Sequence, residues 1–231
     1  QLRQEMVRRI GEQQVSERWF DYFHLGSELD LIDATHAVDP TLLRLFKRPE
    51  PVFLMVSTIE PRKNHAYLID AFERAWAAGS QARLCIVGKI GWKCETLIER
   101  IQRHPQLDSR LFMFNNLTDQ SLEHAYRHST ALVFPSYVEG FGLPLVEAMQ
   151  RGLPAMGSDI AVFREIGGEF MTYFDLDDPQ SLANLVIEME RTGVFPATRN
   201  LDQWQWLSWR QASAQLVERI ECHISEVVPD R

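Results

Sequence analysis

The chain has 231 residues, of which 45% are hydrophobic, a size that suits one large α/β domain or one domain with appendages. Its net charge of −8 argues against nonspecific nucleic-acid binding, because proteins of that class normally carry a basic face. Three widely spaced cysteines without a C-x-x-C pair are typical of a reduced, cytoplasmic protein. The sequence shows neither a signal peptide nor an apolar run long enough to predict a membrane-spanning helix.

The first 50 residues are predicted to hold only short elements. Residues 1–14 carry apolar side chains at helical spacing. The chain starts inside this charged helical pattern without an initiator methionine, which indicates a piece of a longer protein. Residues 18–24 alternate aromatic and polar side chains like a strand, and Leu25 and Gly26 begin a turn. Residues 39–50 contain two prolines and three basic residues, so a surface connection with one helical turn is expected.

From residue 51 onward, apolar runs and helical patterns alternate about six times. Continuous apolar runs indicate strands that are buried on both faces of a parallel sheet. The alternation predicts an α/β fold, a Rossmann-like open, mostly parallel sheet with helices on both faces. Ligands of such sheets bind beyond the carboxyl ends of the strands. Strands are predicted at 51–56, 83–87, 111–114, 131–134, around 155–156 and at 171–174.

The helical patterns lie between these strands and after the last of them. One is predicted to end at Gly79, and Thr118 or Asp119 is expected to cap another. The last pattern runs from Trp204 to Ile224, and three tryptophans at helical spacing are expected to be core residues. The remaining helices are predicted around 97–101, 122–127, from about 144, at 161–166 and from 177–179 to about 191.

The turn after the strand at 131–134 is the first candidate site. Glycines follow Glu139, and Pro144 suits the first turn of the next helix. A strand, a glycine turn and a helix start together offer free N–H groups and a positive dipole end to a phosphate or a sugar oxygen. Glu139 and Glu147 bracket the turn with seven residues between them. They provide two acceptors for one polyhydroxylated ligand.

The turn after the strand at 51–56 is the second candidate site. It reads S-T-I-E-P-R-K-N over residues 57–64, with Arg62 and Lys63 where a helix is expected to start. Free N–H groups and the dipole already favour an anion at a helix start, and two cations strengthen that preference. The pattern therefore predicts an anion site.

These two stretches together resemble family 4 of the retaining glycosyltransferases, which have the GT-B fold. E-G-F-G-L-P-x-x-E-A, from Glu139 to Ala148, resembles the E-x7-E motif of that family. The stretch at 57–64 is similar to the G-T-x-E-P-R-K-N variant of O-antigen mannosyltransferases. The resemblance covers residues from about 20 to 220, nearly the whole chain.

The resemblance implies a role for each matched residue. Lys63 and Glu139 are implied as catalytic residues, with Lys63 on the donor diphosphate and Glu139 on the hydroxyls of the transferred sugar. Glu147 is implied to bind the ribose, and the base is expected against the turn at 115–117. Thr58 stands where many relatives have an arginine, so Arg62 is expected to supply part of the charge. The full set of implied donor-binding residues is Thr58, Arg62, Lys63, Lys89, Asn116, Leu117, Glu139, Gly140, Phe141, Gly142, Leu143 and Glu147.

The resemblance also implies an activity and a domain plan. Residues 1–30 would be the tail of a preceding domain and a linker, residues 31–200 a domain that binds the nucleotide-sugar donor, and residues 201–231 a helix that packs back toward the first domain. GDP-mannose is favoured over UDP-sugars, and no metal or cofactor is expected. The hexose would go to a growing polysaccharide or a lipid-linked glycan bound by the missing domain. The full-length protein is expected in the cytoplasm, at the inner face of the membrane, and the chain alone is expected to be inactive.

Two other functions remain open, and the residues of the chain argue against several more. A noncatalytic nucleotide-binding module and a sugar-nucleotide epimerase of GT-B architecture both remain as alternatives. Two carboxylates also occur in glycoside hydrolases, but the basic stretch favours a nucleotide donor. His124 and His128 lie four residues apart without a third ligand motif, so a metal site is disfavoured. A dehydrogenase is disfavoured because G-x-G-x-x-G does not follow the first strand.

Overall fold

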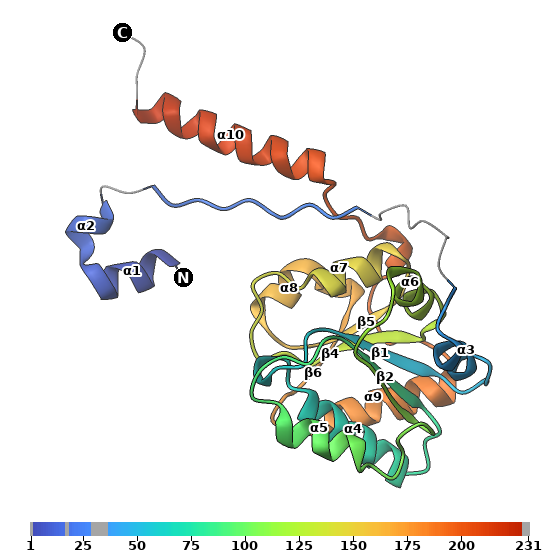
Figure 1. The fold of residues 1–231 in the computed structure, drawn as a ribbon. Helices are drawn as coiled ribbons and strands as arrows, with labels where there is room; N and C mark the ends of the chain where they lie inside the picture. The colour runs from blue at the N-terminus through green and yellow to red at the C-terminus, as the bar shows by residue number, and fades with distance from the viewer. Residues whose placement is uncertain (1, 17–18, 29–36, 228–231) are drawn as a thin grey trace. The chain divides into compact units, whose positions relative to one another are not determined.

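The computed structural model describes residues 2–16, 19–28 and 37–227, and the chain divides into two compact units (Figure 1). One unit comprises Gln1–Glu28 together with Trp206–Arg231, and the other comprises Leu29–Gln205. No helix in the described ranges is both long and apolar enough to cross a lipid bilayer. The division into domains at residues 30 and 200 stays a prediction.

The larger unit is built on a six-stranded sheet in which all neighbouring strands are parallel. The strand order is β3-β2-β1-β4-β5-β6, so the chain first extends the sheet on one side of β1 and then returns to its other side. The loops after β1 and β4 therefore leave neighbouring strands in opposite directions, which is where such sheets bind ligands. The strands are β1 (Val52–Val56), β2 (Arg83–Val87), β3 (Leu111–Phe114), β4 (Ala131–Phe134), β5 (Ala155–Ser158) and β6 (Thr172–Phe174).

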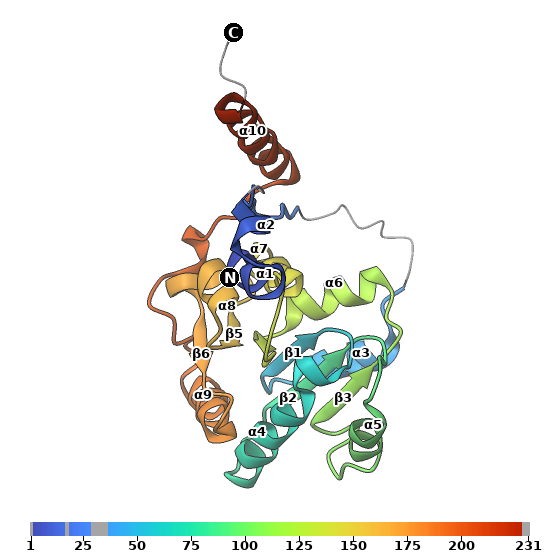
Figure 2. The same cartoon turned by 90° about the vertical axis from the view of Figure 1, so that its left-hand side faces the viewer.

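Helices cover both faces of this sheet (Figures 1 and 2). Helices α4, α5 and α9 lie on one face, and α6, α7 and α8 lie on the other. Phe72 of α4 and Val186 of α9 belong to one buried cluster with Phe53 and Val133 of the sheet. The helices of this unit are α3 (Pro40–Phe46), α4 (His65–Ala77), α5 (Glu95–Gln102), α6 (Asp119–His128), α7 (Leu143–Gln150), α8 (Ala161–Gly167) and α9 (Pro179–Thr192).

The segment before β1 is packed more tightly than the predicted surface connection. Leu42 and Leu45 of α3 are fully buried. Arg83, itself buried, donates hydrogen bonds to the carbonyl oxygens of Leu45, Arg48 and Glu50, so β2 holds this segment in place. Most residues of this segment are exposed or half-buried, as expected of a surface connection, but two leucines and a buried guanidinium anchor α3.

The loops after β1 and β2 are in backbone contact at the carboxyl edge of the sheet. The N–H of Ile59 donates to the carbonyl oxygen of Lys89 at 2.8 Å, and the N–H of Gly91 donates to the carbonyl oxygen of Ile59 at 3.0 Å. Gly88 lies in this contact, where an added Cβ atom would stand 1.8 Å from the carbonyl oxygen of Ser57. A residue without a side chain is needed there for the two loops to stay together.

The smaller unit contains α1 (Leu2–Ile10), α2 (Glu12–Ser16) and α10 (Trp209–Val227). The helix predicted over 1–14 is interrupted at Gly11, which has a positive φ of 87°. Residues 19–28 lie against α10, where Trp19 stacks on His223 with ring centroids 4.4 Å apart. The strand predicted over 18–24 is wrong for residues 19–24, which form no sheet, because their aromatic side chains pair with a helix instead; residue 18 lies outside the described ranges.

The tryptophan-rich segment also differs from its prediction. The helix begins at Trp209 rather than Trp204, and Trp209 is 49% exposed, so the prediction of a core role is wrong for this residue. The indole N–H groups of Trp204 and Trp206 donate to the backbone carbonyls of Ile166 and Leu25. Hydrogen bonding by the indoles, and not helical spacing, sets where these two side chains lie.

Replacing Gly88 tests the close contact between the loops. Gly88→Ala should lower the free energy of unfolding by about 3 kcal/mol, since backbone must move to admit the methyl group. Gly140→Ala is the matched control, because a Cβ atom at Gly140 meets no atom within 4 Å and the change should stay within about 0.5 kcal/mol. Urea denaturation of both variants measures this, and equal effects would contradict the contact.

Candidate functional site

The loop after β1 presents its basic residues on a tight turn. Pro61–Lys63 form one turn of 3-10 helix, Asn64 adopts the left-handed conformation with φ 54°, and α4 begins only at His65. Arg62 and Lys63 therefore do not start α4, as predicted, but belong to the short 3-10 turn that precedes it. A left-handed residue between the turn and the helix changes the chain direction there, which local sequence periodicity does not reveal.

The loop after β4 crosses the loop after β1. The N–H of Tyr137 donates to the carbonyl oxygen of Arg62 at 2.9 Å. The carbonyl oxygen of Ser136 accepts from the hydroxyl of Ser158 at 2.6 Å, which fixes the loop from the β5 side. Gly142, with φ 94°, then precedes α7. These contacts place the glycine turn beside the basic turn, as the strand order predicts.

Lys63, Arg62 and Glu139 meet where the two loops cross. The Nζ atom of Lys63 lies 2.5 Å from Oε1 of Glu139, and a guanidinium nitrogen of Arg62 lies 3.0 Å from Oε2. The side chains of Lys63 and Glu139 are only 9% and 5% exposed, whereas Arg62 is 44% exposed. Nζ of Lys63 also stands 5.0 Å from the centre of the Phe134 ring. We call these three residues the charged cluster.

The charged cluster is held in place by its own electrostatics. Burial makes an unpaired charge costly, so Lys63 and Glu139 stabilise each other as long as both are ionised. Arg62 extends the network through its Nε atom, which lies 2.6 Å from Oε1 of Glu60. Two cations thus face two carboxylates. An incoming anion can bind the cations if it competes with Glu139 for their hydrogen bonds.

Glu147 lies on α7 and is held by a different partner. The hydroxyl of Tyr126 on α6 donates to Oε2 of Glu147 at 2.9 Å. Tyr126 is almost fully buried, and this burial with the nearby Glu147 carboxylate raises the pKa of its hydroxyl well above the usual value. Tyr126 therefore stays a hydrogen-bond donor at neutral pH and orients the carboxylate.

The other predicted residues lie on loops at the same edge. Thr58 and Lys89 are exposed, on the loops after β1 and β2. Asn116 and Leu117 follow β3, Asn116 being exposed and Leu117 half-buried. The structure thus brings Arg62, Lys63 and Glu139 into direct contact and leaves the others on separate loops. In the glycine turn Gly140 is exposed and Phe141 is half-buried, while Leu143, the first residue of α7, is exposed.

Three residues of the site were not predicted. Glu60 pairs with Arg62, Tyr126 orients Glu147, and His65, two residues after Lys63, is buried. Glu60 stands within the stretch that carries the resemblance, so the motif itself could have indicated it. Tyr126 comes from a helix with no motif of its own, and only the packing of α6 against α7 reveals its role.

His65 is a buried titratable group beside the charged cluster. Its side chain is 1% exposed, and its Nε2 atom lies 3.3 Å from the hydroxyl oxygen of Ser57. Burial, and secondarily the positive charge of Lys63, lowers the pKa of His65 to about 4. The imidazole is therefore neutral at neutral pH.

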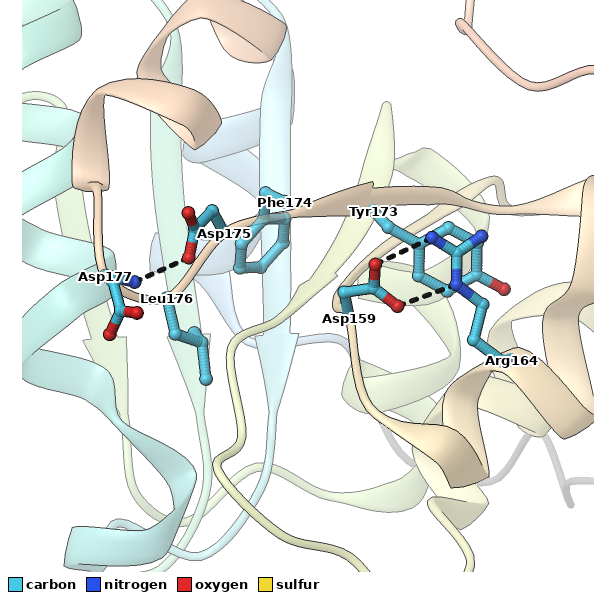
Figure 3. Close-up of a pocket in the computed structure, with 7 residues that line it drawn as sticks. All are labelled: Asp159, Arg164, Tyr173, Phe174, Asp175, Leu176 and Asp177. Carbon is cyan, nitrogen blue, oxygen red and sulfur yellow. Dashed lines mark hydrogen bonds and ion pairs between the residues drawn. The ribbon is translucent and has the colours of Figure 1, made fainter.

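A hollow of about 430 Å³ lies at the carboxyl ends of β5 and β6 (Figure 3). Arg164 forms two hydrogen bonds to Asp159, at 2.7 and 2.8 Å, and its guanidinium stacks 3.6 Å from the centre of the Tyr173 ring. Asp175-Leu176-Asp177, an Asp-x-Asp sequence, lines the same hollow. Within the described ranges, no three His, Cys, Asp or Glu side chains are arranged to hold a metal ion.

The chain is similar to known glycosyltransferases. Residues 44–201 match the family model described as "Glycosyl transferases group 1". A serotype-specific mannosyltransferase WbdA of Escherichia coli is 40% identical over 203 residues, which are 86% of this chain and 24% of that protein. The O-antigen chain mannosyltransferase B of Escherichia coli is 26% identical over 71% of this chain and 44% of that protein. The chain therefore spans less than half the length of these relatives.

Solved structures share the fold. A sucrose-phosphate synthase from Thermosynechococcus elongatus superposes with a TM-score of 0.69 over 97% of this chain and 57% of that chain, at 22% identity. Anabaena HepE in complex with UDP and glucose gives a TM-score of 0.62 over 80% of this chain and 53% of that chain, at 19% identity. The predicted α/β fold, a parallel sheet with helices on both faces, is confirmed.

The low pKa of His65 predicts a pH-dependent stability. The unfolded chain binds a proton at this residue near pH 6.5, and the folded chain binds it only near pH 4. The stability due to neutral His65 is therefore complete above pH 6.5 and is lost as the pH falls toward 4, a change of about 3 kcal/mol. Urea denaturation between pH 4 and 7 should show this loss in the wild type but not in His65→Gln. Parallel curves for the two proteins would contradict the prediction.

Proposed function

We propose, because this chain belongs to the glycosyl transferases group 1 family, that the charged cluster binds the diphosphate of a nucleotide-sugar donor. The observation that carries the proposal is the contact of Lys63 and Arg62 with Glu139 at the crossing of the loops after β1 and β4. Cations held at the carboxyl edge of a parallel sheet, next to a helix start, suit a diphosphate. The buried ion pair keeps these cations in position before the donor arrives.

The cations act on the leaving group. During transfer the bond between the anomeric carbon and the β-phosphate oxygen breaks, and its electron pair stays on the diphosphate. Lys63 and Arg62 stabilise this growing negative charge more in the transition state than in the ground state, which is what accelerates a reaction. Backbone N–H groups of the glycine turn, from Gly140 to Leu143, add donors at the start of α7. The cluster works without a metal or other cofactor in this proposal.

Glu139 changes partners when the donor binds. Its carboxylate neutralises Lys63 and Arg62 in the structure. A diphosphate carries more negative charge and takes over part of this interaction, which frees carboxylate lone pairs for hydroxyl groups of the transferred sugar. Glu139 is thereby placed beside the reacting sugar by the same residues that hold the leaving group.

GDP-mannose is the donor that we favour over UDP-sugars. Relatives that are 40% and 26% identical to this chain carry mannosyltransferase names, and this supports mannose as the transferred sugar. Glu147 binds the ribose in the orientation that Tyr126 fixes, and the base lies against Asn116 and Leu117. Lys89 and Thr58, on the neighbouring loops, complete the donor site.

The acceptor belongs to the complete protein. We infer that the full-length enzyme transfers mannose to a growing polysaccharide or a lipid-linked glycan, in the cytoplasm at the inner face of the membrane, and that a preceding domain binds this acceptor. The chain covers only 24% and 44% of the length of two relatives, which supports a separate domain for the acceptor in the full-length enzyme. On this proposal the 231-residue chain binds donor nucleotide but transfers sugar poorly.

Calorimetric titration tests the donor site. GDP should bind the chain more tightly than UDP, and Lys63→Ala should weaken GDP binding about ten- to a hundredfold, because one charge-assisted hydrogen bond is lost. Lys47→Ala is the matched control, since Lys47 is an exposed lysine before β1, at the opposite edge of the sheet. Unchanged GDP affinity in a folded Lys63→Ala variant would remove Lys63 from the site.

A further inference from the structure

A cavity of about 450 Å³ lies beside the charged cluster, between the starts of α4 and α5. The loops after β1, β2 and β4 contribute to its wall, so it opens at the same edge of the sheet as the donor site. We propose that this cavity binds one neutral sugar residue of the glycan substrate, an inference that rests on the glycosyltransferase function proposed above. The lining residues used below are Glu60, Asn64, His65, Lys93, Arg100 and Tyr137.

Most charged groups of the cavity already have partners. Arg100 donates to Asp70 at 2.6 Å and to Glu73 at 2.9 Å. Glu60 pairs with Arg62 and accepts a hydrogen bond of 3.1 Å from the indole N–H of Trp92. These pairs leave little attraction for a charged ligand. Lys93 is the exception, but its ammonium lies at the exposed rim, 5.4 Å from the centre of the Trp92 ring.

The groups that lack partners are uncharged. Nδ2 of Asn64 and Nδ1 of His65 are buried and have no hydrogen-bond partner in the described part of the chain. The two side chains are 6% and 1% exposed, and both line the cavity. Buried polar atoms normally find a partner. Hydroxyl groups of a bound sugar can both donate and accept, so they can satisfy an amide and a neutral imidazole together.

Aromatic rings stand where a sugar would pack. Tyr137 is 57% exposed and forms part of the cavity wall, although a tyrosine normally buries its ring. Trp92 is equally exposed, at 57%, and its hydrogen bond to Glu60 fixes the indole beside the wall. A hexose has an apolar C–H face that packs on such rings and hydroxyl groups around its edge. A cavity with one aromatic wall residue, Tyr137, and with uncharged polar groups is complementary to both features.

Arg62 connects this cavity to the donor site. Its side chain contacts Glu60 on the cavity side and Glu139 in the charged cluster. A sugar residue held here would keep a glycan chain next to the loop that binds the donor. The inferred occupant is therefore part of the polymer that the enzyme elongates, and not the donor itself.

NMR of the tryptophan indole N–H groups, with α-linked mannobiose as the probe, tests this inference. The chain has six tryptophans, and a Trp92→Phe variant assigns the Trp92 signal. All titrations with mannobiose are made in saturating GDP, so that the nucleotide part of the donor site is filled. We expect the Trp92 signal to shift saturably. Tyr137→Ala should weaken this binding about three- to tenfold and Tyr137→Phe should preserve it, because the ring makes the contact.

A matched control and a GDP titration separate the possible results. Tyr22→Ala removes a tyrosine that is 64% exposed in the smaller unit, and it should leave mannobiose binding unchanged. If GDP binds but the Trp92 signal does not move with mannobiose, or if Tyr137→Ala and Tyr22→Ala behave alike, the cavity inference is overturned and the donor site stands. If mannobiose binds and GDP does not, the cavity inference stands and the proposed donor function fails.

Discussion

The buried ion pair between Lys63 and Glu139 is the interaction on which the rest of the site depends. The two residues are 76 positions apart in the chain and come from loops on either side of the sheet's switch point, yet Nζ and Oε1 are 2.5 Å apart. Breaking such a pair would leave a buried charge without compensation, which is strongly destabilising. The pair therefore fixes both loops, and it places cations and a carboxylate at one point before any ligand binds.

A few close backbone contacts of the fold bring Lys63 and Glu139 together. The strand order brings β1 and β4 together, and the hydrogen bond from Tyr137 to the carbonyl of Arg62 joins their loops. On the other side of β1, Gly88 allows the loop after β2 to support the loop that carries Lys63. Backbone hydrogen bonds between neighbouring loops thus hold the cations in place before an anion binds.

Sequence patterns correctly predicted strands that can be recognised from an apolar run of neighbouring residues. The runs at 83–87, 111–114 and 131–134 have the same bounds as β2, β3 and β4, because the inner strands of a parallel sheet are mostly apolar. The same reasoning failed at residues 19–24 and at Trp209, where aromatic residues contact a helix or solvent. Periodicity alone does not distinguish those environments from a sheet or a core.

The site could be predicted in part. The resemblance to a known family selected Lys63 and Glu139, and the structure places them in contact, while the roles implied for them remain proposals. Tyr126 and His65 were not predicted, because the importance of Tyr126 comes from its contact with Glu147 on another helix and that of His65 from its burial, neither of which the sequence motifs show. Asn64 adopts the left-handed conformation, which asparagine takes up more readily than most residues, but helical periodicity alone does not indicate it.

Calorimetry of GDP binding to Glu139→Gln tests the central claim most directly. The amide keeps the shape of the side chain but removes the charge that competes for Lys63 and Arg62. If these cations bind the diphosphate, GDP affinity should rise about tenfold in the variant, provided that it folds like the wild type. An unchanged or weaker affinity in the folded variant would contradict the account, because it would show that the diphosphate does not take the place of Glu139 on these cations.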